Sequence, residues 1–244
     1  MAPRARRQAR PRHRPGATAT VVLATLVAAA ATTGTAHAAG LRLALVGTEA
    51  GNAAPLADAI ASLHAATAPR ASGATAIIDQ RNATFVPGVI GIETGTRVTF
   101  PNSDNTLHHV YSFSPAKTFE LPLYSGRRAD PVLFDKPGVV TLGCNIHDWM
   151  VAHVVVLDTP WHAQSGADGR VRLEAPPGEY ELRIWHERAT APHTQRVTLA
   201  GEGDPRTIRI PLAPAHPLPT AGAGQSRLRA LQQRLRTPPR EPEP

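Results

Sequence analysis

Short runs of alternating or β-branched apolar residues recur between residues 41 and 212, and Gly, Pro, Asn and Asp separate them. Such runs are typical of strands, and the separating residues favour turns. The pattern predicts strands at 41–46, 75–78, 89–93, 97–100, 109–113, 139–142, 153–157, 170–174, 180–185, 195–199 and 206–212. Many short strands at this spacing indicate an all-β chain of β-sandwich modules rather than an α/β fold.

The sequence of residues 54–67 suits either a helix or a strand. Leu56, Ile60 and Leu63 share one face if this segment is helical, but the segment also suits a strand. Helix and strand therefore both stay open here.

The stretch "DTPWHAQSGADG" at 158–169 predicts a boundary between two domains. Residues 39–158, about 120 in number, make a domain of ordinary size. Residues 159–213, about 55, make a small β-sandwich module that is expected to pack against the first domain for stability. Residues 214–244 are rich in Pro and Arg and are predicted to be a disordered tail, with a short amphipathic helix at 226–236 as the alternative.

The charge of the chain is concentrated at its N-terminus. The 244 residues carry a formal net charge of +7, which by itself suggests a phosphate-rich or anionic-lipid partner. Residues 1–38, however, hold six arginines, then an apolar run, then "AHA", which is the order of a secretory signal peptide. Cleavage after Ala38 leaves 7 − 6 = +1, which argues against nucleic-acid binding by the mature chain.

A signal peptide predicts a periplasmic or secreted protein without a membrane span after cleavage. Arg6 and Arg7 also suggest twin-arginine export, but Gln8, Ala9 and Arg10 follow where a hydrophobic residue is expected, so the export route stays open. The chain has a single cysteine and so no internal disulfide. A free thiol in an oxidising compartment needs protection or a function, and metal ligation supplies both.

Candidate metal ligands cluster in "TLGCNIHDWMVAHVVV", residues 141–156, where Cys144, His147 and Met150 follow one another at intervals of three. Copper that cycles between +1 and +2 favours two imidazoles, one thiolate and a weak axial thioether. The cluster offers three of these four groups. The fourth is available in "FPNSDNTLHHVYSF", residues 100–113, which contains His108 and His109.

Other chemistries fit these residues less well. A buried cysteine is often only a small apolar side chain. Zinc is disfavoured because thioether is a poor zinc ligand and a second cysteine is absent from the sequence. A Cys–His nucleophile lacks a visible orienting group, and covalent haem attachment needs a C-x-x-C-H motif.

The two segments together, "FVPGVIGIETGTRVTFPNSDNTLHHVYSF" and "FDKPGVVTLGCNIHDWMVAHVVVLD", resemble the cupredoxins, the type 1 blue copper proteins. The resemblance is greatest to the amicyanin and plastocyanin group and to the "methylamine utilization protein" type. It implies a Greek-key β-sandwich holding one copper, Cu(I)/Cu(II), with the ligands His108, Cys144, His147 and Met150.

Two positions depart from the family pattern. His109 stands where the family has Asn after the first ligand, and Asn145 stands where Ser or Thr follows the cysteine. In the family these two residues hydrogen bond across the site and join the ligand strands. We therefore predict that His109 and Asn145 face one another and replace that bond.

Four side-chain ligands leave no open position for substrate, which favours a one-electron carrier over an enzyme. The resemblance implies that His147 is the electron port for redox partner proteins. Trp149 and Pro101 are candidate docking residues, although Trp149 equally suits packing of the loop, and Asp148 is a candidate for steering a basic partner. The alternative function with the same ligands is copper delivery or storage.

The second module, "DGRVRLEAPPGEYELRIWHE", resembles the carboxypeptidase-regulatory and transthyretin-like sandwiches, which are usually structural or adhesive. His186 and His193 offer a second metal site in principle, but surface histidines are common.

Overall fold

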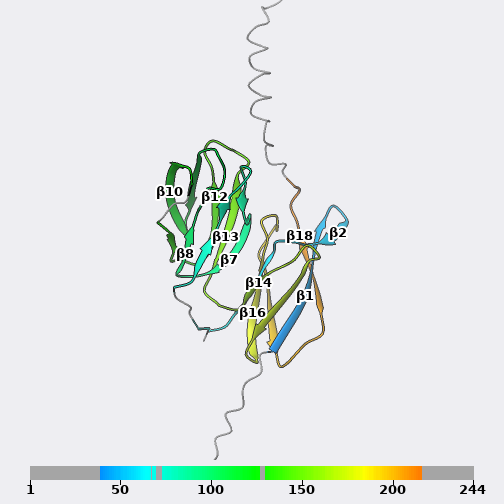
Figure 1. Cartoon of the computed structure of the whole chain (residues 1–244). Helices are drawn as coiled ribbons and strands as arrows, with labels where there is room; N and C mark the ends of the chain where they lie inside the picture. Colours follow the sequence, from blue (N-terminus) through cyan, green and yellow to red (C-terminus); the bar gives the residue numbers. More distant parts are fainter. Residues whose placement is uncertain (1–38, 67, 70–72, 127–129, 216–244) are drawn as a thin grey trace, which may run out of the picture. The chain divides into compact units, whose positions relative to one another are not determined.

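The structure is a computed structural model that describes residues 39–66, 68–69, 73–126 and 130–215 (Figure 1). The described part contains strands β1 to β18 and no helix, which confirms the predicted all-β class. It follows that no helix in this part is long and apolar enough to cross a membrane. The predicted signal peptide, and residues 216–244 of the predicted tail, lie outside the described residues.

The strands between residues 74 and 158 form the first sandwich. Its main sheets have the orders β10-β9-β12-β13-β7 and β11-β8-β4, and β5 pairs with β6. The strands are β4 (Thr75–Ile77), β5 (Asp79–Gln80), β6 (Phe85–Val86), β7 (Val89–Glu93), β8 (Thr96–Thr99), β9 (His108–Ser114), β10 (Lys117–Tyr124), β11 (Val132–Phe134), β12 (Gly138–Gly143) and β13 (Val151–Leu157).

One apolar core fills this sandwich, with Phe85, Phe100 and Phe134 among its fully buried side chains. Along β12 the inward residues Val140 and Leu142 alternate with more exposed ones, as the sequence pattern predicts. Cys144 and Met150 belong to the same core. The candidate ligands therefore stand at the end of a packed structure.

The second sandwich has sheets of order β15-β1-β18, with β2 added to β1, and β14-β3-β16-β17. Its strands are β1 (Ala39–Glu49), β2 (Asn52–Pro55), β3 (Ile60–His64), β14 (His162–Gln164), β15 (Arg170–Ala175), β16 (Gly178–Trp185), β17 (His193–Leu199) and β18 (Arg206–Pro211).

This pairing corrects the predicted domain boundary at residue 39. Strand β1 pairs antiparallel with β15 and parallel with β18, and β3 pairs with β14 and β16. Residues 39–64 thus complete both sheets of the C-terminal module. The physical reason is size, because a chain of about 55 residues buries only a marginal core by itself, and strands β1 and β3 enlarge that core.

The open segment, residues 54–67, contains the end of β2 and all of β3, and no helix. Asp58 has a left-handed backbone (φ 58°) and separates the two strands. Residues 60–63 are all buried, so β3 shows a continuous run instead of the alternation of a half-exposed strand. The hydrophobic pattern therefore could not distinguish a strand from a helix in this segment.

Gly169 provides a stability test of this discontinuous sandwich. Its φ is +72°, and a Cβ there would collide with the Leu45 carbonyl of β1 and approach the Leu56 nitrogen to 2.9 Å. We expect Gly169→Ala to lower the free energy of unfolding by about 2–4 kcal/mol, because backbone strain and steric overlap add. Gly51→Ala is the matched control, since Gly51 has φ +87° but open space around it, and about 1 kcal/mol is expected. Equal losses in urea unfolding would contradict this packing of β1.

His162 of β14 gives a pH test. Burial lowers the pKa of His162, and the nearby Glu93 carboxylate only partly opposes this. As the pH falls through about 6.5, the unfolded chain therefore takes up a proton at this histidine before the folded protein does. The free energy of unfolding is unaffected by this group above that pH and decreases as the pH falls toward the folded-state pKa. We expect His162→Gln to show a smaller loss of melting temperature between pH 7.5 and 5.5. An unchanged loss would contradict a neutral, partly buried His162.

Candidate metal centre

The two candidate ligand segments meet at one end of the first sandwich. His108 is the first residue of β9, and Cys144 directly follows the last residue of β12. Strands β9 and β12 are neighbours in the sheet, and Gly143 pairs with Tyr111. The start of one strand and the end of its antiparallel neighbour therefore lie at the same edge, as the sequence prediction required.

The donor atoms of three predicted ligands converge. The Nδ1 atoms of His108 and His147 are 3.1 Å apart, and the Cys144 Sγ lies 3.8 Å from the same His147 Nδ1. All three donors lie within 4.8 Å of one another, and no other group of three potential ligands converges in this way within the described ranges. Because a bond from a metal to an imidazole nitrogen is about 2.0–2.1 Å, one ion can reach both Nδ1 atoms.

The ligands differ in burial. His108 is fully buried and Cys144 is 3% exposed, whereas His147 is partly exposed. Burial, and to a smaller extent the neighbouring His108, lower the pKa of His147 despite the opposing Asp104 carboxylate. A neutral imidazole is the form that binds metal, so His147 is ready to coordinate near neutral pH.

Met150 lies at the end of the loop that carries Cys144 and His147. It is 1% exposed, and its amide donates to the His147 carbonyl at 2.9 Å. Its side chain belongs to the same core as Cys144. Axial ligation by its thioether remains a prediction.

Asp104 is a residue that the sequence analysis missed. One oxygen of its carboxylate lies 2.8 Å from His108 Nε2, on the side of the ring opposite the converging Nδ1. Burial raises the pKa of Asp104, but hydrogen bonds from the Ala83 amide, from His108 and from the Asn82 amide outweigh it, so the pKa is lowered. The available signal was the spacing Asp104-x-x-x-His108, which was too common to single out.

The predicted hydrogen bond between His109 and Asn145 is not formed. His109 Nε2 is hydrogen bonded to Glu120 at 2.8 Å, and its ring packs against Tyr111. Asn145 is exposed and makes no hydrogen bond to a described residue. Glu120 lies on β10, which pairs with β9, and binds Nε2 of His109. The other ring nitrogen, Nδ1, is buried and has no hydrogen-bond partner among the described residues.

Trp149 packs against the loop and its surroundings. Its Nε1 donates to the Ala83 carbonyl at 3.0 Å, and its ring centroid is 5.1 Å from that of His147. The Pro101 carbonyl accepts from Gln80, which ties this region to β5. A docking role for Trp149 stays a prediction.

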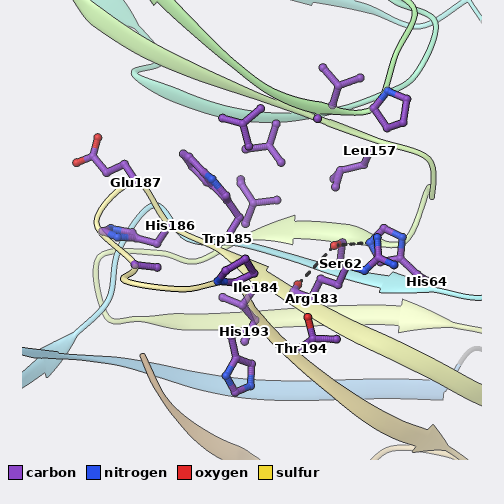
Figure 2. Close-up of a pocket in the computed structure, with 18 of the residues that line it drawn as sticks. Ser62, His64, Leu157, Arg183, Ile184, Trp185, His186, Glu187, His193 and Thr194 are labelled. Atoms are coloured by element: carbon purple, nitrogen blue, oxygen red, sulfur yellow. Dashed lines mark hydrogen bonds between the residues drawn. The ribbon is translucent and has the colours of Figure 1, made fainter. Parts of the chain in front are cut away.

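Trp185, His186, Glu187 and His193 of the second module are among the residues that line a cavity of about 590 Å³ (Figure 2). His186 Nδ1 accepts the Arg188 amide at 3.1 Å. The buried Nε2 of His193 has no hydrogen-bond partner among the described residues. Neither histidine belongs to a group of three converging donors there, so the described residues do not assemble a second metal site.

No protein-family model and no curated protein matches the chain. Among solved structures the chain is similar to a purple cupredoxin from Nitrosopumilus maritimus, at 27% identity over 35% of this chain and all of that one, with a TM-score of 0.30. It is also similar to a copper-containing nitrite reductase from Thermus scotoductus, at 23% identity over 39% of this chain and 25% of that one, with a TM-score of 0.33. A third similar structure is the Cu(I) form of an amicyanin variant, at 17% identity over 40% of this chain and 98% of that one, with a TM-score of 0.32.

Proposed function

We propose that the chain binds one copper ion through His108, Cys144 and His147, with Met150 as a weak axial ligand. The observation that carries this proposal is the convergence of two imidazole nitrogens and one thiol within 4.8 Å at the end of the sandwich. Two imidazoles and a thiolate are the donor set of type 1 copper, and the thiolate gives such a centre its intense visible colour and its affinity for the reduced metal.

We further propose that the copper centre carries single electrons by outer-sphere transfer. A carrier works best when its ligands move little between oxidation states. Cys144 and Met150 belong to the packed core, and His108 is fully buried. Only His147 reaches solvent, and its neighbour Ile146 is 48% exposed. An imidazole edge beside an exposed apolar side chain suits brief contact with a redox partner protein.

Export to the periplasm or outside the cell belongs to this proposal and rests on the sequence of residues 1–38. In that setting a free thiol is protected when it is both buried and bound to metal. Cys144 is the single cysteine of the chain and is buried.

The electron-carrier proposal is tested by a redox titration of the copper-loaded mature chain, residues 39–244. We expect one reversible one-electron couple and rapid electron exchange with an inorganic outer-sphere complex that does not bind metal. Slow or irreversible oxidation, together with rapid loss of Cu(I) to a competing chelator, would instead support copper delivery.

A further inference from the structure

The hydrogen bonds around Asp104 fix the position of a proton. An ionised carboxylate only accepts hydrogen bonds. The Asp104 carboxylate accepts from the Asn82 amide at 2.6 Å and the Ala83 amide at 2.8 Å, and it faces His108 Nε2 at 2.8 Å. His108 must therefore carry its proton on Nε2, which leaves the Nδ1 lone pair pointing to Cys144 and His147.

The turn that binds Asp104 also contacts the other histidine. Asn82 and Ala83 both have left-handed backbones, with φ of 54° and 50°, which side chains rarely adopt. In this conformation their consecutive amides point at one anion. The Ala83 carbonyl accepts the Trp149 indole N–H at 3.0 Å, and the Trp149 ring packs against His147. One turn is thus linked to both imidazoles.

Asp104 is itself anchored on its own side. Its amide donates to the Asn102 side chain at 2.9 Å, and the Asn102 amide group donates to the carbonyls of Thr106 and Tyr124. Asn102 is 4% exposed. Asp104 is therefore held by hydrogen bonds at its amide and at both carboxylate oxygens, and its side chain is only 15% exposed, in contrast to a mobile surface carboxylate.

We propose that Asp104 is a positioning residue that holds His108 in its metal-binding tautomer. The Asn82–Ala83 turn, which binds Asp104 and Trp149, then links the position of His108 to that of His147. This inference rests on the proposed function, because it assigns a role toward the same copper. The carboxylate also places one negative charge next to a ligand, which stabilises Cu(II) more than Cu(I). Asp104 thus sets both the affinity and the potential of the centre.

Asp104→Asn is the informative substitution, because it keeps the size of the side chain. The new amide has one acceptor and two donors. The Asn82 amide binds Oδ1, whereas the Ala83 amide and His108 Nε2 share Oδ2. An Asn oxygen in the Oδ1 position leaves its NH₂ facing His108 Nε2, which draws the imidazole proton to Nδ1 and blocks metal binding. An Asn oxygen in the Oδ2 position keeps the Nε2 proton but loses the bond from the Asn82 amide and the negative charge. We expect copper affinity to fall by about 10–100-fold. We expect the affinity ratio of Cu(II) to Cu(I) to fall at least about tenfold, which raises the midpoint potential by about 59 mV for a one-electron couple.

Asp148→Asn is the matched control. Asp148 is adjacent to His147, is exposed, and has no hydrogen bond or ion pair to any described residue. It therefore loses the same charge at a similar place without touching a ligand. We expect less than a threefold change in copper affinity, because exposed charges act weakly.

The tautomer is measured first in the metal-free mature protein, by ¹⁵N NMR of the imidazole nitrogens. We expect His108 to be protonated at Nε2 in the wild type and in Asp148→Asn, and to show a population protonated at Nδ1 only in Asp104→Asn. This readout needs no copper, so it stands even if the wild type shows no blue colour and the proposed function fails. A wild-type His108 protonated at Nδ1 would overturn the inference, as would equal copper affinities for the two variants.

Discussion

Cys144→Ser is expected to abolish the intense visible absorption of the copper-loaded protein while both sandwiches stay folded. The colour of the proposed centre arises from the thiolate bond to copper, and a serine hydroxyl is neither soft nor ionised at neutral pH. The substitution keeps nearly the same shape in a residue that is 3% exposed. Burying a hydroxyl without a partner costs about 1–3 kcal/mol, which a folded domain tolerates.

This result is read from absorption spectra and from far-ultraviolet circular dichroism of the same samples. Met150→Leu is the control variant, because it keeps both imidazoles and the thiolate and removes only the weak thioether. We expect Met150→Leu to retain a visible band of altered energy. A band that survived Cys144→Ser would refute the ligand assignment, since the sequence offers no other cysteine.

His147→Gly and His108→Gly are expected to respond differently to added imidazole. His147 is partly exposed, and the backbone of its loop is held by the hydrogen bond from the Met150 amide to the His147 carbonyl, which glycine keeps. Its removal should lower copper affinity on the order of a hundredfold or more, since even an outer partner of a ligand is worth 10–100-fold. Free imidazole can enter the resulting gap and restore the visible band.

His108 offers no such entry. It is fully buried, and its Nε2 is held by Asp104. We expect His108→Gly to lose the band and to stay colourless at imidazole concentrations that restore His147→Gly. The measurement is an imidazole titration of both copper-loaded variants at equal protein concentration. Rescue of both variants, or of His108→Gly alone, would contradict the assignment of His147 as the exposed ligand.

Much of the fold could be predicted because alternation reports a strand with one buried face. Each predicted segment overlaps an observed strand, and some, such as 170–174 and 180–185, lie wholly within one. The segment of β3 stayed open between helix and strand because residues 60–63 are all buried and show no alternation. The partner of β1 was unpredictable for another reason, since pairing with β15 and β18 depends on contacts over more than 120 positions, which no local pattern encodes.

Some residues of the candidate site could likewise be predicted from the sequence, and others could not. His108, Cys144 and His147 could be found because their chemistry and spacing are rare, and the structure brings their donors together. Asp104 and Glu120 could not be found, because carboxylates are common and their partners depend on strand register and on a left-handed turn. The expected bond between His109 and Asn145 is not formed, because Glu120 on the neighbouring strand binds Nε2 of His109 and Asn145 does not reach the buried Nδ1.

The central claim is that His108, Cys144 and His147 hold one copper, and a copper titration of the mature chain followed by visible absorption tests it most directly. We predict an intense thiolate-to-copper band that rises in proportion to added Cu(II), stops at one equivalent, disappears on reduction and returns on reoxidation. Copper binding without that band, or a band that continues to rise beyond one equivalent, would contradict the claim.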